Sequence, residues 1–323
     1  MNKHHRPRRL RMTDVLRQMV QETRLCPADL IYPVFVTRSN PGPIDAMPDV
    51  YRHTISEAVD IARRAADAGV SGLMLFGIPQ SKDEHASRAL SASGVISDTV
   101  EAIKNEGLNL VIITDVCVCS YISHGHCGIV HDDVVSNDET LPVLAQMAKI
   151  HADSGADIVA PSAMMDHQVH AIREKLDSSG HEHVSILSYS VKYASSFYGP
   201  FRDAAGGAPA FGDRKTHQMD SANRLEAMRE VDLDIAEGAD LLMVKPALAY
   251  LDVIHMISQH RPHIPLVAYN VSGEYSMVKA AAKQGYVDEA SVVLEILTSI
   301  RRAGSKSVIT YHALDVARWL QKS

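Results

Sequence analysis

The feature that most constrains the fold of this chain is a regular alternation of short apolar runs and longer amphipathic stretches. Eight runs are rich in apolar and β-branched residues, as expected of strands: 30–36, 72–76, 108–115, 158–162, 185–191, 241–245, 266–271 and 308–311. Helix-like stretches separate most of them: 56–68, 139–154, 166–176, 221–237, 251–260, 275–284, 289–302 and 314–321. Strands that alternate with helices predict a parallel sheet covered by helices.

Eight such units in about 300 residues predict an α/β fold, a single (β/α)8 barrel of the TIM type. An open doubly wound sheet would more typically carry a G-x-G-x-x-G turn after its first strand, and the chain has none there. No Pro-rich or Ser-rich linker divides the sequence. We therefore expect an N-terminal arm over 1–25 that makes subunit contacts, and one catalytic barrel domain over 26–323.

Composition excludes several classes of protein. The longest apolar runs in the 323 residues fall far short of the roughly 20 that span a membrane, so we expect no transmembrane helix. The basic N-terminus is followed by no apolar segment of the kind found in a secretory signal, which favours a cytoplasmic protein. The balance of 32 basic to 39 acidic residues argues against nucleic acid as a partner.

Three of the four cysteines, Cys117, Cys119 and Cys127, fall within eleven residues directly after the third strand-like run. Three thiolates can hold a zinc ion and leave its fourth position to water or substrate, whereas a structural zinc usually has four protein ligands. The alternatives are cysteines that lie close without a metal, or a closed site completed by His124 or His126. Chemistry in such a barrel lies at the carboxyl ends of the strands, so the position of the cluster favours the open, catalytic site.

Polar residues follow six of the predicted strands: Asp115 with Cys117, then Ser162, Lys192, Lys245, Ser272 and Tyr311. Lys192 and Lys245 follow neighbouring strands, so we expect their ammonium groups to meet in a partly desolvated barrel mouth. Burial and like charge lower a lysine pKa, and a neutral amine can attack a ketone to form a Schiff base. A change from about 10.4 to about 7 requires roughly 4 to 5 kcal/mol. Alternatively, each lysine reaches solvent or pairs with a carboxylate.

The segment 193–220 is rich in Gly, Ala and aromatic residues and is longer than an ordinary connection. We interpret it as a lid, whose glycines permit motion and whose aromatic rings exclude water. Arg202 and Arg214 in this segment could bind a substrate carboxylate. A surface loop with ordinary arginines is the alternative.

Five motifs in these segments carry a resemblance to a known family: 114–119, 123–128, 195–203, 243–246 and 271–275. Together they resemble the 5-aminolevulinate dehydratases, also called porphobilinogen synthases, and the likeness extends over nearly the whole chain after the arm. The resemblance implies a lyase, a hydro-lyase, of tetrapyrrole and heme biosynthesis. Such an enzyme condenses two 5-aminolevulinate molecules to porphobilinogen with loss of two waters.

The resemblance also implies roles for particular residues. Lys245 would form a Schiff base with the P-side substrate molecule and Lys192 with the A-side molecule, while Asp115 would lie near the amino group or a transferred proton. Arg202 and Arg214 match residues that bind the A-side carboxylate. The P-side carboxylate would be bound by Ser272 and Tyr311, and the remaining substrate-binding residues would be Gln218, Tyr198, Phe201 and Ser162.

Metals and assembly follow from the same resemblance. Zinc on Cys117, Cys119 and Cys127 would act as a Lewis acid toward the A-side molecule. Glu230 matches a glutamate that helps bind an allosteric magnesium in many bacterial members, although an ordinary solvated glutamate is the alternative. The arm resembles one that wraps a neighbouring subunit, in a family that is usually a homo-octamer.

Two positions depart from the family pattern. Ala163 stands where an acidic residue is common, and His217 where tyrosine is frequent; both concern fine contacts rather than the proposed lysines or zinc ligands. Two other functions remain open at this point: a Schiff-base aldolase on a barrel with a structural zinc, and a zinc-stabilised scaffold without catalysis.

Overall fold

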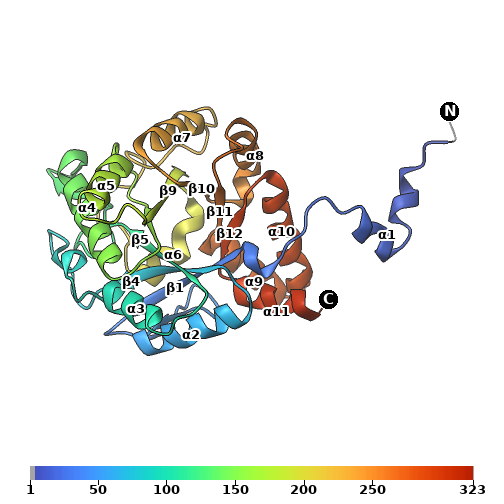
Figure 1. Ribbon diagram of the computed structural model, residues 1–323, viewed down its shortest axis with the longest axis horizontal. Helices are drawn as coiled ribbons and strands as arrows, with labels where there is room; N and C mark the ends of the chain where they lie inside the picture. The colour runs from blue at the N-terminus through green and yellow to red at the C-terminus, as the bar shows by residue number, and fades with distance from the viewer. Residues whose placement is uncertain (1–3, 323) are drawn as a thin grey trace.

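The computed structural model describes residues 4–322, so the first three residues of the expected arm and the last residue of the expected barrel domain lie outside it. Eight parallel strands form the barrel: β1 (Leu30–Thr37), β4 (Gly72–Ile78), β5 (Val111–Val116), β8 (Ile158–Pro161), β9 (Ser185–Lys192), β10 (Leu241–Lys245), β11 (Leu266–Asn270) and β12 (Ser307–Thr310). They follow this order around the sheet, and β12 pairs with β1, which closes it. The predicted (β/α)8 barrel is thus confirmed (Figure 1).

Helices cover the outside of the barrel (Figure 1). They are α2 (Ile55–Asp67), α3 (Val95–Lys104), α4 (Asn137–Asp153), α5 (Gln168–Asp177), α7 (Glu226–Glu237), α8 (Leu251–His260), α9 (Ser272–Lys283), α10 (Glu289–Ala303) and α11 (Ala313–Lys322). At the start of α2, the Thr54 hydroxyl accepts a hydrogen bond from the Glu57 N–H, and the Glu57 carboxylate accepts one from the Thr54 N–H. This reciprocal cap explains why that helix begins where the sequence suggests.

The two long connections contain structure of their own. Within 116–137 the chain forms an antiparallel hairpin of β6 (Ile129–His131) and β7 (Val134–Ser136). The expected lid contains the short helix α6 (Gly199–Ala205), which follows the 3-10 turn η4 (Ser196–Tyr198). Two further short strands, β2 (Gly42–Pro43) and β3 (Tyr51–His53), extend the sheet beside β1.

The core has two layers, one on each face of the barrel sheet. Inside the barrel lie large buried side chains that include Phe35, Met74, Tyr189, Met243 and Tyr269. A larger layer of mostly aliphatic side chains fills the space between the strands and the surrounding helices. Because alternate residues of a strand face opposite sides, each strand contributes to both layers.

The N-terminal segment contains the 3-10 turn η1 (Pro7–Arg11) and the helix α1 (Asp14–Met19). Figure 1 shows it extending away from the barrel. Several of its apolar side chains are exposed, among them Leu10, Met12, Val15 and Met19. No helix of the described part of the chain is long and apolar enough to cross a membrane.

Candidate active site

Lys192 and Lys245 end two neighbouring barrel strands, and their Cα atoms are register partners between β9 and β10. Both side chains are buried, with 6% and 5% of their surface exposed. Neither forms an ion pair with a carboxylate among residues 4–322. The two lysines therefore lie side by side in the mouth of the barrel, and neither reaches solvent.

An aromatic cage surrounds the amine of Lys245. Its Nζ lies 4.4 Å from the ring centre of Tyr269, 5.0 Å from Phe201, 5.1 Å from Tyr189 and 5.2 Å from Tyr198. These rings take the place of hydrating water. Burial, reinforced by the positive charge of Lys192, lowers the pKa of Lys245 to about 7, so a substantial fraction of the amine is neutral, and hence nucleophilic, near neutral pH.

Asp115, near the end of β5, is an acidic group close enough to Lys245 for its charge to raise the pKa of that lysine. Its Oδ1 is shielded from solvent and has no hydrogen-bond partner. Burial, reinforced by the negative charge of Cys119, raises the pKa of Asp115 to about 6. A carboxyl group that titrates near neutral pH beside an amine can both accept and return a proton. Ser162, at the end of β8, accepts a hydrogen bond from Lys192 Nζ through its carbonyl oxygen.

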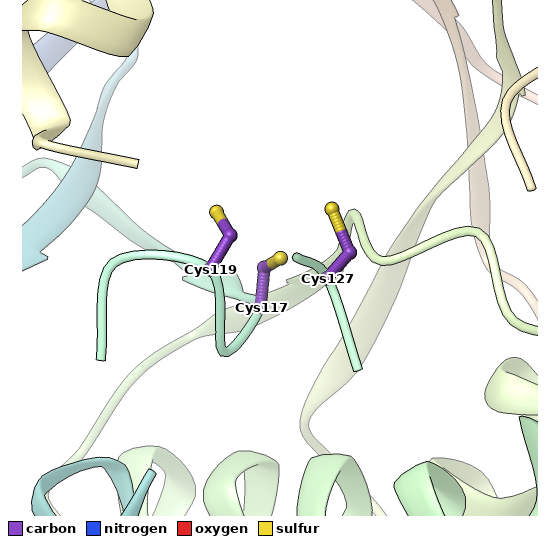
Figure 2. Close-up of side chains that lie close together, drawn as sticks. All are labelled: Cys117, Cys119 and Cys127. Atoms are coloured by element: carbon purple, nitrogen blue, oxygen red, sulfur yellow. The ribbon is translucent and has the colours of Figure 1, made fainter. Parts of the chain in front are cut away.

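Cys117, Cys119 and Cys127 form a compact group of buried thiols just beyond β5 (Figure 2). Their sulfur atoms lie within 4.8 Å of one another. A tetrahedral zinc with Zn–S bonds of about 2.3 Å would place the sulfurs roughly 3.8 Å apart, so the three thiols fit such an ion with little movement. His124 and His126 are not part of this group, and neither supplies the fourth ligand of a closed site here.

The surroundings of the cluster favour a thiolate at one of its members, Cys127. Hydrogen bonds from Cys117 and Cys119, together with the positive charges of Arg214 and Lys192, hold the pKa of Cys127 well below its usual range. Thiolate is the form that binds zinc. Hydrogen bonds with Cys119 and Cys127, together with burial, raise the pKa of Cys117. The cluster therefore offers one ready thiolate, on Cys127, and a metal with thiolate ligands would displace the remaining thiol protons on binding.

The lid lies folded into the barrel mouth. Phe201 on α6 contacts two aromatic side chains of the barrel interior, Phe35 at 5.5 Å and Phe76 at 5.1 Å between ring centres. The Tyr198 hydroxyl donates a hydrogen bond of 3.1 Å to the carbonyl oxygen of Lys245. The lid therefore closes directly over the Lys245 amine, which agrees with its interpretation from sequence.

Arg202 and Arg214 both lie in the lid, and neither forms an ion pair with a carboxylate in the described part of the chain. Arg214 is buried and donates hydrogen bonds to the carbonyl oxygens of Gly125 and Gly207, which connects the cysteine loop with the lid. Burial and the charge of Arg214 lower the pKa of Arg202. Two neighbouring guanidinium groups without a carboxylate partner form a suitable site for a carboxylate ligand, although Arg214 also faces the thiols of the cysteine cluster.

Ser272 and Tyr311 follow the last two barrel strands, β11 and β12. Ser272 begins α9, and its hydroxyl accepts a hydrogen bond of 3.0 Å from the Phe201 N–H of the lid. The Tyr311 hydroxyl lies 3.1 Å from that of Tyr269. The positions of these two residues suit their expected role, which is to bind the carboxylate of the substrate molecule held by Lys245.

Glu230 and Gln218 line a cavity of about 1050 Å³ between α7, the end of the lid and the start of α5. Gln218 is buried and its side-chain amide has no partner. Burial and the nearby acidic groups of Asp234, Glu226 and Asp166 raise the pKa of Glu230 to about 7. The cavity is not lined by Lys192, by Lys245 or by any of the three clustered cysteines.

A second group of metal-compatible side chains, Glu289, His312 and Asp315, lies behind the mouth. The ammonium of Lys279 is 3.0 Å from the Glu289 carboxylate and already neutralises it. We assign no metal to this group.

The residues that sequence reasoning missed are Tyr189 and Tyr269 of the cage. Tyr189 lies near the middle of β9 and Tyr269 is the next-to-last residue of β11, and both face the barrel interior. The sequence pattern marks both only as strand residues, which does not distinguish cage residues from ordinary core.

The fold and the two facing lysines define a barrel enzyme whose amines can attack a carbonyl group. Comparison with known proteins agrees with this class of enzyme and identifies its family. The family model described as Delta-aminolevulinic acid dehydratase matches residues 4–319. The chain is 50% identical to the Delta-aminolevulinic acid dehydratase of Bacillus subtilis over 318 residues, 98% of either chain. It is 53% identical to that of Methanothermobacter thermautotrophicus over 315 residues, 96% of either chain.

A solved structure gives the same result. The crystal structure of delta-aminolevulinic acid dehydratase (porphobilinogen synthase) from Toxoplasma gondii in complex with the reaction product porphobilinogen superposes with a TM-score of 0.96 at 43% identity. The match covers 99% of this chain and 92% of that one. The chain belongs to the delta-aminolevulinic acid dehydratase family, and it is a lyase with porphobilinogen synthase activity. This finding sets aside the aldolase and scaffold alternatives.

Proposed function

We propose that the chain carries out porphobilinogen synthesis by binding two 5-aminolevulinate molecules as Schiff bases on Lys245 and Lys192. The observation that carries the proposal is the pair of buried lysines in register, with the Lys245 amine inside an aromatic cage. In its neutral form this amine attacks the ketone carbon of the substrate. The carbonyl oxygen then leaves as water, and a C=N bond replaces the C=O bond.

The two substrate carboxylates are bound on opposite sides of the mouth. Arg202 and Arg214 bind the carboxylate of the A-side molecule, which supplies the carboxylate partner that neither arginine has in the described part of the chain. Ser272 and Tyr311 bind that of the P-side molecule, whose ketone is on Lys245. Because the lid carries both arginines as well as Phe201 and Tyr198 of the cage, closure of the lid would bring both substrates together and exclude water.

We further propose that the enzyme is of the zinc-dependent type, with the metal on Cys117, Cys119 and Cys127. The support is the compactness of the three buried thiols, the absence of a histidine from their group among residues 4–322, and the positive charges that favour a thiolate at Cys127. When bound, zinc supplies Lewis-acid polarisation of an oxygen in the A-side substrate. Asp115 faces the same space and is our candidate for holding the transferred proton.

Three finer expectations remain proposals. Glu230 lines an acidic cavity together with Asp166, Glu226 and Asp234, which is compatible with the oxygen ligands that magnesium prefers. The exposed apolar side chains of the arm suit a contact with a neighbouring subunit of a homo-octamer. The cytoplasmic location stays a prediction from the sequence.

Borohydride trapping tests the central proposal. The enzyme is incubated with 5-aminolevulinate, reduced with borohydride and digested, and the labelled peptides are mapped by mass spectrometry. We expect the label on the Lys245 peptide, and no such label after Lys245→Met. Lys104→Met is the matched control, because Lys104 is a surface lysine paired with Asp157 at 2.8 Å. An unlabelled Lys245 peptide in the unmodified enzyme would refute the proposal.

A further inference from the structure

Glu274 is a buried carboxylate that joins the ends of two barrel strands. Its side chain is 1% exposed and lies in the first turn of α9, two residues after Ser272. One carboxylate oxygen accepts a hydrogen bond of 2.8 Å from the N–H of Leu248, three residues after Lys245. The other accepts hydrogen bonds from the N–H of Val271 at 3.0 Å and from the Asn270 amide at 2.9 Å.

The connection continues to a third strand. Asn270 accepts a hydrogen bond of 2.9 Å from the Thr310 hydroxyl through its Oδ1. Thr310 in turn accepts one of 3.2 Å from the His312 N–H. A single buried network thus connects the carboxyl ends of β10, β11 and β12, which carry Lys245, Ser272 and Tyr311. Such networks fix geometry when all their members are satisfied.

Part of this arrangement has an ordinary structural purpose. An acidic residue at the third position of a helix commonly accepts the N–H of the preceding cap, and the Val271 contact is of this kind. The Leu248 contact is different, because it spans 26 residues and reaches the turn that follows another strand. A helix cap alone does not require that contact.

We propose that Glu274 is a positioning residue that sets the distance between the Lys245 amine and the Ser272 hydroxyl, and so selects keto acids by the spacing between ketone and carboxylate. The inference rests on the proposed function, in which these two residues bind the two ends of one substrate molecule. Glu274 itself touches neither end. Its effect is to hold the turn after Lys245 against the start of α9.

Glu274→Gln tests this with little change in shape. The substitution replaces one oxygen by an NH₂ group, which then faces either the Leu248 N–H or the Val271 and Asn270 donors. Either orientation places donor against donor and should separate the two strand ends. Asp240→Asn is the matched control, because Asp240 accepts the Ile186 N–H at 2.8 Å at the opposite, amino end of β10. Residues at that end of a barrel contribute to stability rather than to the active site.

The probes are levulinate, a keto acid, and butanone, which is the same ketone with the carboxylate replaced by hydrogen. Borohydride reduces either imine on Lys245 to a stable secondary amine, and the initial rates of labelling are compared at equal concentration. We expect the unmodified enzyme to prefer levulinate. In Glu274→Gln this preference should fall at least tenfold, with the butanone rate changed less than threefold, whereas Asp240→Asn should keep the preference.

The outcomes separate the two proposals. If the unmodified enzyme labels levulinate no faster than butanone, the assignment of Ser272 and Tyr311 to the carboxylate fails, and with it this part of the proposed function. If the preference exists and Glu274→Gln retains it, the positioning role is refuted. If circular dichroism shows that Glu274→Gln does not fold, Glu274→Asp replaces it. The shorter aspartate side chain cannot reach both Leu248 and Val271. An unchanged preference for levulinate in Glu274→Asp would also overturn the inference.

Discussion

Lys192 and Lys245 are cross-strand partners at the carboxyl end of the barrel, where Tyr189 on β9 contacts both amines. The ring centre of Tyr189 lies 5.6 Å from the Nζ of Lys192 and 5.1 Å from that of Lys245. Burial raises the pKa of the Tyr189 hydroxyl, so the ring stays neutral and offers no counter-charge. The positive charge of Lys192 therefore acts on Lys245 with little compensation from this ring.

The first prediction concerns pH. Because the pKa of Lys245 is lowered to about 7, the neutral amine increases as pH rises through 7, and the rate of levulinate trapping should rise with it. Lys192→Met removes the like charge, so the pKa of Lys245 rises and the profile moves to higher pH. The measurement is the trapping rate from pH 5.5 to 9.5. An unmoved profile in Lys192→Met would show that the two amines do not interact.

The same shift affects stability, which gives the second prediction. Unfolding returns the pKa of Lys245 from about 7 to about 10.4. Between these two pH values the unfolded state binds more protons at this lysine than the folded state does. The contribution of Lys245 to the free energy of unfolding therefore rises with pH over this range. Lys245→Met removes this dependence. At pH 7 it should stabilise the fold by a few kcal/mol, up to about 4, while abolishing activity. Urea unfolding at pH 7 and 9.5 measures both effects, and a destabilised variant at pH 7 contradicts the prediction.

The third prediction is that a change at Asp115 shifts the pH profile of trapping in the opposite direction to Lys192→Met. The negative charge of Asp115 raises the pKa of Lys245. Asp115→Asn removes that charge, so the trapping profile should move to lower pH, opposite to the change in Lys192→Met. Turnover of 5-aminolevulinate should nevertheless fall, by about 10²- to 10⁴-fold if Asp115 transfers a proton. Retained turnover with a shifted trapping profile would show that Asp115 acts only through its charge.

The positions of the reactive residues followed from the sequence because strand ends are set by local pattern. Lys192 and Lys245 each follow an apolar, partly β-branched run, and parallel strands place such residues at one end of the barrel. The cysteine cluster was located for the same reason. The sequence left open whether His124 or His126 joins the three cysteines, because that depends on how the loop folds; in the structure neither histidine belongs to the group.

Other features depended on contacts distant in sequence. The helix α3 was missed because it begins after Gly94, which makes no side-chain cap, and contains several β-branched residues. The network around Glu274 joins Leu248 to a carboxylate 26 residues away, and no periodicity records that contact. The lid was recognised by composition, but its closed position depends on Phe201 packing against Phe35 and Phe76, which belong to the first two barrel strands.

The fourth prediction concerns the metal. Cys119→Ala removes one of three thiol ligands, so zinc affinity should fall by more than the ~10- to 100-fold that loss of an outer-shell partner costs. Turnover should be lost, while levulinate trapping on Lys245 stays within a few fold. Zinc content by atomic emission and turnover after chelation and readdition of zinc measure this. Cys26→Ala is the control, because Cys26 is exposed and outside the cluster. Unchanged turnover in Cys119→Ala refutes a catalytic metal at these thiols.

The fifth prediction tests how the lid seats on the barrel. Gly273 has no side chain where the lid backbone approaches α9, and a Cβ there would lie 2.5 Å from the carbonyl oxygen of Phe197. Gly273→Ala should therefore displace η4 and α6, cost about 1–3 kcal/mol in stability, lower turnover and speed trypsin cleavage at Arg202.

Gly199→Ala is the matched control in the same lid. Its Cβ meets nothing within 4 Å and its backbone is helical, so alanine should leave the lid in place and strengthen α6 by up to ~1 kcal/mol. Equal trypsin sensitivity in the two variants would mean that contact with Gly273 does not hold the lid closed.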